Sequence, residues 1–211
     1  MSQSKILASL CLLWLAIAQP ADAGDRYLKL IGGLGDLDDG GSLDVRSPEF
    51  ADGAADADYG SGFAGGLAFG ADFGKFTLEL DYLYRSNDFD RVTFADGRTV
   101  SDGNYASVTI GANAYYRFRR DSAFQPYLGA GIGWIQEVDV DFEEDGVETS
   151  FETDELGLQL MAGFRWTSET RWLVDAQLRW LSASGVTMES ELGAGTVEAD
   201  YKPLTLLVGV G

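Results

Sequence analysis

The residues of this chain best suited to chemistry are carboxylates. Glu79 and Asp81 are two positions apart, so an extended strand would place both side chains on one face. Such a pair could in principle act as general acid and general base. The 211-residue sequence contains no histidine, the usual group for proton transfer near neutral pH and for activating a serine. We therefore expect no catalytic residue, no cofactor and no enzymatic activity, and we assign the two carboxylates to structural ion pairs.

A second group of carboxylates lies in the acid-rich tract 137–155. Carboxylate oxygens suit hard cations such as Ca²⁺ and Mg²⁺. The spacing of a twelve-residue calcium loop is absent, so a solvated acidic rim is the favoured interpretation and a cation site the weaker one. The weak metal candidates are Asp139, Asp141, Glu143, Glu144 and Asp145.

The first 23 residues have the pattern of a cleaved signal peptide. Lys5 precedes an apolar run over 6–18, and Ala21 and Ala23 form a small-residue cleavage site. Residues 24–211 are then the mature domain, and they contain no cysteine, because Cys11 lies inside the apolar run. This excludes a disulfide or a thiolate metal site from the mature chain. The net charge of −19 argues against a nucleic-acid partner.

The mature sequence is organised as eight segments in which apolar and polar residues alternate. In 75–85, Phe76, Leu78 and Leu80 fall on one face while Glu79 and Asp81 fall on the other. This alternation is typical of a strand with one apolar and one polar side. The expected strands are 27–34, 62–73, 75–85, 106–118, 125–136, 156–166, 171–181 and 204–210.

The connections between these segments alternate in length. Short ones at 74, 119–124 and 167–170 separate long ones at 35–61, 86–105, 137–155 and 182–203. Short turns at one end and long loops at the other are typical of bacterial outer-membrane barrels. The sequence therefore predicts an all-β fold, an eight-stranded antiparallel up-and-down transmembrane β-barrel with its long loops outside the cell.

The polar face of the expected strands carries charges of both signs, whereas the apolar face of the four clearest strands carries none. An eight-stranded barrel has an interior just wide enough for side chains to fill, and buried charges there need partners. We predict that the polar face lines the lumen and forms an ionic network, with Asp72 on the same face. The predicted network comprises Lys29, Glu79, Asp81, Arg85, Arg117, Arg165, Asp175 and Arg179.

Aromatic residues of the apolar face are predicted to form two bands at opposite ends of the barrel, as expected at two membrane interfaces. The band at the short turns comprises Phe73, Phe76, Phe118, Trp166 and Trp172. The band at the long loops comprises Phe63, Tyr82, Tyr84, Trp134 and Trp180.

Three stretches resemble the small outer-membrane β-barrel family, the group of OmpA-like and OmpX-like barrels and Omp25-like porin-family proteins. They are LELDYLYR at 78–85, NAYYRF at 113–118 and PYLGAGIGW at 126–134. The resemblance implies a protein of the Gram-negative cell envelope, located in the outer membrane. Barrels of this family usually end in an aromatic residue, whereas this sequence stops at Gly211, so either further residues follow, which is the favoured interpretation, or the insertion signal is atypical.

The expected role is structural or interactive, through the long loops. These tracts hold 26 acidic residues against three arginines and one lysine. Anionic lipids and lipopolysaccharide of the outer leaflet would repel such a rim unless Ca²⁺ or Mg²⁺ stood between them. We expect a monomer with these lipids as its partners. The alternative is a small gated pore for ions or small solutes.

Overall fold

The computed structural model describes residues 25–37, 43–47, 50–100, 103–144, 147–169, 172–190 and 196–211. The expected signal peptide lies outside the described residues. The strands are β1 (Arg26–Leu37), β2 (Leu43–Ser47), β3 (Phe50–Tyr59), β4 (Gly62–Phe73), β5 (Phe76–Thr93), β6 (Thr99–Val100), β7 (Gly103–Arg117), β8 (Phe124–Glu144), β9 (Val147–Thr167), β10 (Leu173–Ser190), β11 (Thr196–Tyr201) and β12 (Pro203–Val210).

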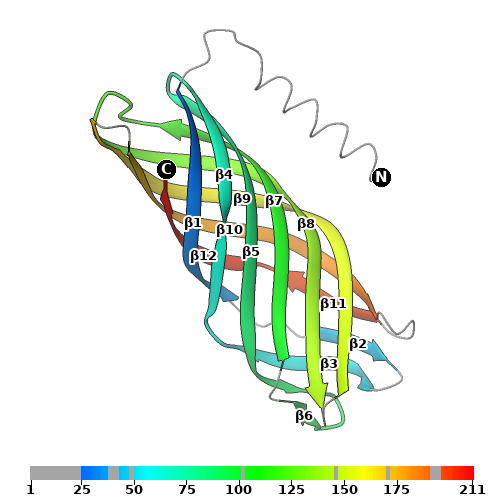
Figure 1. The fold of residues 1–211 in the computed structure, drawn as a ribbon. Coiled ribbons are helices and arrows are strands. Elements are labelled where there is room, and N and C mark those ends of the chain that lie inside the picture. The colour runs from blue at the N-terminus through cyan, green and yellow to red at the C-terminus, as the bar shows by residue number, and fades with distance from the viewer. Residues whose placement is uncertain are drawn as a thin grey trace.

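Eight of these strands close into a barrel in which every neighbour is antiparallel (Figure 1). Its wall runs β1, β4, β5, β7, β8, β9, β10, β12 and back to β1. The closure is visible at Val210, which is paired with Leu30 of β1 on one side and with Val174 of β10 on the other. The predicted eight-stranded antiparallel barrel is confirmed.

The long connections differ from the prediction, because most of their described residues are strand rather than loop. β8 and β9 continue past the expected strand ends and remain paired up to Glu144 and Val147. β2, β3 and β11 lie within the expected loops, where β2 pairs with both β3 and β11. In Figure 1, β2, β3 and β6 lie together at one end of the barrel. Outside a membrane neither face of a strand has to be apolar, so the alternation that revealed the other strands is missing here.

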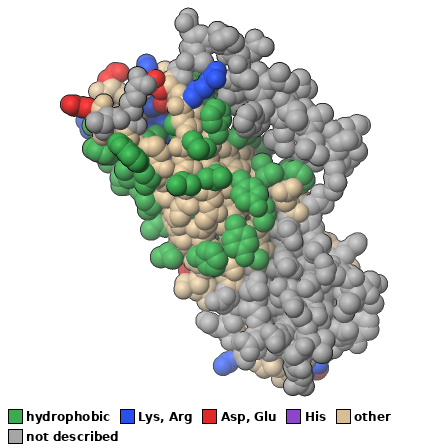
Figure 2. All heavy atoms as spheres, in the orientation of Figure 1, with side chains coloured by type: hydrophobic (Ala, Val, Ile, Leu, Met, Phe, Trp, Pro, Cys, Tyr) green, Lys and Arg blue, Asp and Glu red, His purple; other side chains and the backbone are tan. Residues whose placement is uncertain are grey.

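The apolar face of the wall points outward and the polar face inward. On β1, Leu28 and Leu34 are 63% and 68% exposed, whereas Lys29 between them is 2% exposed. Figure 2 shows apolar side chains over the visible wall, with charged side chains toward its two ends. A wall that exposes leucines and buries a lysine is suited to lipid outside and to polar contacts inside.

The predicted aromatic bands also lie on the outer face. Phe73 and Phe76 flank the turn at Gly74, whose φ of 66° favours glycine, and both rings are exposed. At the opposite end, Phe63 packs against Tyr84 with ring centroids 5.8 Å apart. Trp134 is half-buried and Trp180 is exposed.

Within the described residues, no helix is long and apolar enough to cross a membrane.

Candidate functional site in the barrel lumen

The lumen contains the largest group of buried polar side chains in the described chain. Strand alternation brings them there: β5 turns Thr77, Glu79, Asp81 and Arg85 inward, at intervals of two or four residues. Opposite β5, β10 contributes Asp175, Gln177 and Arg179 in the same way. Facing strands therefore bring carboxylates and guanidinium groups of distant sequence positions into one narrow space.

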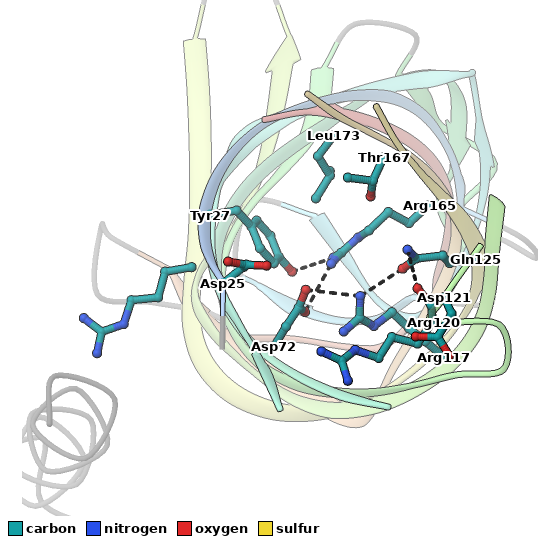
Figure 3. A pocket seen from close by; sticks show the side chains of 11 residues that line it. Asp25, Tyr27, Asp72, Arg117, Arg120, Asp121, Gln125, Arg165, Thr167 and Leu173 are labelled. Atoms are coloured by element: carbon teal, nitrogen blue, oxygen red, sulfur yellow. Dashed lines mark hydrogen bonds and ion pairs between the residues drawn. The ribbon is translucent and has the colours of Figure 1, made fainter. Parts of the chain in front are cut away.

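At the short-turn end, Asp72 of β4 binds two arginines. Its carboxylate is 3.1 Å from Arg117 Nη1 and 3.3 Å from Arg165 Nη1, and it accepts a hydrogen bond of 2.6 Å from the Thr77 hydroxyl. Figure 3 shows Asp72, Arg117 and Arg165 pointing toward one another inside the ring of strands. They line a cavity of about 510 Å³, and the exposed residues Asp25, Arg26, Arg120 and Asp121 line the same cavity at its rim. This end of the lumen is an ionic vestibule.

Tyr27 joins this vestibule to the middle of the lumen. Its hydroxyl accepts a hydrogen bond from Arg165 Nη2 at 2.6 Å and donates one to Glu79 Oε2 at 2.6 Å. The Arg165 guanidinium also lies 4.4 Å from the centre of the Tyr27 ring. Gly70 makes room for that ring, since a Cβ there would lie 2.1 Å from Tyr27 Cζ.

In the middle of the lumen, Lys29 lies between two carboxylates from different strands. Its Nζ is 3.0 Å from Glu79 Oε2 and 3.2 Å from Asp175 Oδ1. Tyr115 donates to Glu79 at 3.1 Å, and Tyr127 donates to Asp175 at 3.0 Å. All five residues are buried, each 4% exposed or less. The ammonium group is thus held by acids from both sides of the lumen.

Above this cluster, Arg179 and Asp81 form a fully buried pair. Arg179 Nη2 lies 2.7 Å from Asp81 Oδ2, and both side chains have 0% exposure. Asn113 donates a further hydrogen bond of 2.7 Å to the same carboxylate oxygen, and Arg179 Nε donates to Gln177 Oε1 at 2.9 Å. Both charges are therefore compensated inside the protein.

Arg85 differs from the other predicted members of the network. It is buried in the lumen, 2% exposed, but it makes no ion pair with a carboxylate in the described part of the chain. Its Nε donates to Thr205 Oγ1 at 3.2 Å and its Nη1 to Thr109 Oγ1 at 3.0 Å. The structure therefore places Arg85 among hydroxyl groups, apart from the ion pairs.

Several uncharged members of the cluster were not part of the predicted network. Tyr27, Tyr115, Tyr127, Asn113 and Gln177 bind its carboxylates or arginines directly. The alternation of the strands could have identified them, because it places these side chains on the same luminal face as the charged residues, and each can donate or accept a hydrogen bond. Sequence reasoning counted charges alone and left these partners out.

The weak metal candidates stay untested. The side chains of Asp139, Asp141, Glu143 and Glu144, which lie on the outer part of β8, and all of Asp145 are outside what the structure describes. Among the residues that it does describe, no group of three or more acidic, histidine or cysteine side chains is arranged to hold a metal ion.

The chain matches the family described as "Outer membrane protein beta-barrel domain" over residues 7–211. It belongs to this outer-membrane β-barrel family. Its location is accordingly the bacterial outer membrane, as predicted.

Individual relatives agree with this assignment. The outer membrane protein PagN of Salmonella typhimurium (strain LT2) is 25% identical over 158 residues, which cover 66% of this chain and 65% of that protein. This chain thus matches just under two thirds of the length of that relative. Among solved structures, OprG of Pseudomonas aeruginosa has a TM-score of 0.63 and 19% identity, and the match covers 89% of this chain and 96% of OprG. The Neisserial surface protein A has a TM-score of 0.53 and 17% identity, with coverage of 88% and 97%. These two structures share the barrel fold.

Proposed function

We propose that this barrel is a surface-interaction protein, with no catalytic activity, whose lumen is closed by the ionic network and whose acidic outer hairpins make its contacts. The observation that carries the proposal is the way in which buried ion pairs cross the lumen. Lys29 on β1 binds Glu79 on β5 and Asp175 on β10, so three separate parts of the wall meet at one ammonium group. Side chains joined in this way fill the space that a solute would need.

The test of the closed lumen is conductance. Purified barrel in a planar lipid bilayer should give no stable current steps, because the luminal side chains are held by partners on opposite strands. The Asp81→Asn variant, which leaves Arg179 without its carboxylate, is the comparison. Reproducible conductance from the unmodified protein would instead favour the alternative, a small gated pore.

The absence of catalysis is tested separately. Neither Glu79 nor Asp81 offers a free carboxylate, since Glu79 binds Lys29 and Asp81 binds Arg179. Expression of the protein in a Gram-negative host should leave the mass spectrum of lipid A unchanged. A new acylation or deacylation product would contradict the proposal and place the protein among the outer-membrane enzymes.

The partners proposed for the hairpins are outer-membrane lipids and lipopolysaccharide, bridged by Ca²⁺ or Mg²⁺. The four outer tracts hold 26 acidic residues against four basic ones, a density that repels the phosphates of the outer leaflet unless divalent cations intervene. Limited proteolysis of intact cells tests this, because a chelator should accelerate cutting within 139–154. Unchanged cutting would leave the hairpins as a solvated rim with no cation bridge.

A further inference from the structure

The vestibule at the short-turn end contains a cavity of about 510 Å³ whose lining differs in charge from the rest of the chain (Figure 3). Four arginines and three aspartates line it, whereas the full sequence has 34 acidic residues and 15 basic ones. The short turns of an outer-membrane barrel face the periplasm. An acidic protein therefore presents to that compartment a cavity in which basic side chains outnumber acidic ones.

Inside this cavity, two buried arginines share one carboxylate. Asp72 lies 3.1 Å from Arg117 and 3.3 Å from Arg165, and it is the only carboxylate within 4 Å of Arg117 among the described residues. Arg165 approaches a second carboxylate, that of Asp175, but at 3.9 Å, and Lys29 binds the same carboxylate at 3.2 Å. The positive charge of the pair is thus incompletely compensated beside the cavity.

The same two guanidinium groups have hydrogen-bond donors to spare. Each carries four N–H groups on its two terminal nitrogens. Polar contacts with described residues account for three of these groups on Arg117 and for two on Arg165. What distinguishes these arginines from Arg179, deeper in the lumen, is the cavity that they line. A planar guanidinium matches the two oxygens of a carboxylate, so the vestibule is suited to a guest of that kind.

Arg120 adds a cation at the mouth of the cavity. It lies in the turn between β7 and β8, and it is exposed. Two rim aspartates, Asp25 and Asp121, are exposed as well, so water and salt screen their repulsion of an anion. The buried charges of Arg117 and Arg165 are screened much less. The cavity therefore attracts anions, and its cations lie at two depths.

We propose that the vestibule binds a small organic dicarboxylate from the periplasm. One carboxylate group reaches the buried pair Arg117 and Arg165, and the other stays near Arg120 at the rim. A cavity of about 510 Å³ falls within the usual size range of small-molecule sites. The ligand enters from the periplasmic side and stops at Tyr27, before the ion pairs in the middle of the lumen, so binding requires no passage through the barrel.

Equilibrium dialysis of the purified barrel in neutral detergent against radiolabelled succinate measures this binding. Sodium chloride keeps the ionic strength constant, so that general screening of charge does not change. Succinate should bind saturably, with one molecule per barrel. Succinamate, in which an amide replaces one carboxylate, should bind about two- to fivefold less tightly, the value of one exposed charge pair. The absence of saturable succinate binding would overturn the proposal, and equal affinity for succinamate would exclude the contact with the second carboxylate.

Two adjacent arginines provide matched variants for the rim. Arg120 lines the cavity, whereas Arg119, its neighbour in the same turn, does not. Both side chains are exposed, so Arg120→Gln and Arg119→Gln should fold, and they change the net charge equally. Arg120→Gln should weaken succinate binding by about two- to fivefold, and Arg119→Gln should leave it unchanged. Equal weakening in both variants would attribute the binding to the general charge of the turn and refute the site.

A second pair of variants tests the charge inside the cavity. Thr167, at the end of β9, is half-buried and lines the same cavity. Thr167→Glu places a carboxylate of the protein next to the arginines, whereas Thr167→Gln adds nearly the same bulk without charge. Succinate binding should be much weaker in Thr167→Glu than in Thr167→Gln, and heat-sensitive electrophoretic mobility verifies that each variant is folded. Equal affinity in the two variants would refute recognition through the arginine charges.

Discussion

At the scale of single residues, the Arg179–Asp81 pair offers the clearest stability prediction. Both side chains are fully buried and 2.7 Å apart, so removal of one leaves the other charge uncompensated. Arg179→Met should lower the free energy of unfolding by about 3 to 5 kcal/mol. Urea unfolding in detergent, monitored by tryptophan fluorescence, measures this loss.

The control for that prediction is Arg98, whose contact with Asp96 is 3.9 Å long and partly exposed. Exposed pairs of this kind contribute at most about 1 kcal/mol, so Arg98→Ala should have little effect. An equal loss of stability in both variants would contradict a stabilising role of the luminal pair.

A second prediction at this scale concerns the glycines of the luminal face. A Cβ at Gly70 would lie 2.1 Å from Tyr27 Cζ, so Gly70→Ala must displace the ring that links Arg165 to Glu79. We expect a destabilisation of about 1 to 3 kcal/mol, typical of overpacking. Gly32→Ala is the matched control, because nothing lies within 4 Å of a Cβ at that lipid-facing position. Comparable losses in the two variants would show that the Tyr27 ring has space to move aside.

At the scale of elements, the outer part of the β8–β9 hairpin should be separable from the barrel. Its tip, residues 143–148, pairs only within the hairpin, because β7 pairs with β8 as far as Phe142 and β10 pairs with β9 as far as Phe151. Replacement of 143–148 by a short turn should therefore leave a strand-dominated spectrum and the heat-sensitive mobility in place. Far-UV circular dichroism and electrophoresis check this, and a shortened protein that fails to fold would mean that the hairpin contributes to closure of the barrel.

At the scale of the whole molecule, the closed wall predicts resistance to detergent. Every strand of the barrel has a hydrogen-bonded neighbour on both sides, so no open edge is available at which unfolding can begin. An unheated sample in sodium dodecyl sulfate should migrate differently from a boiled one, and the unheated sample should retain a strand-dominated spectrum. Identical mobility before and after boiling would contradict a closed barrel.

The sequence by itself determined the barrel and which face of its wall points outward, because lipid outside and polar groups inside require apolar and polar residues to alternate with a period of two along each strand. That period marked Lys29, Glu79 and Arg179 as luminal without any knowledge of their neighbours. It did not reveal β2, β3 or β11, since outside the membrane a buried face can be built from small residues: β3 buries Ala55 and exposes Ala54, so its sequence carries no clear alternation.

Only the tertiary structure decided which luminal groups meet. Strand tilt and register bring Lys29 to both Glu79 and Asp175, which are 50 and 146 residues away in the chain. The same register gives Arg179 its carboxylate and leaves Arg85, only four positions beyond Asp81, with two threonine hydroxyls instead. The alternation along a strand assigns each side chain to the inner or the outer face. Its partner across the lumen depends on the shear of the closed sheet, which is a property of all eight strands together and cannot be read from one strand.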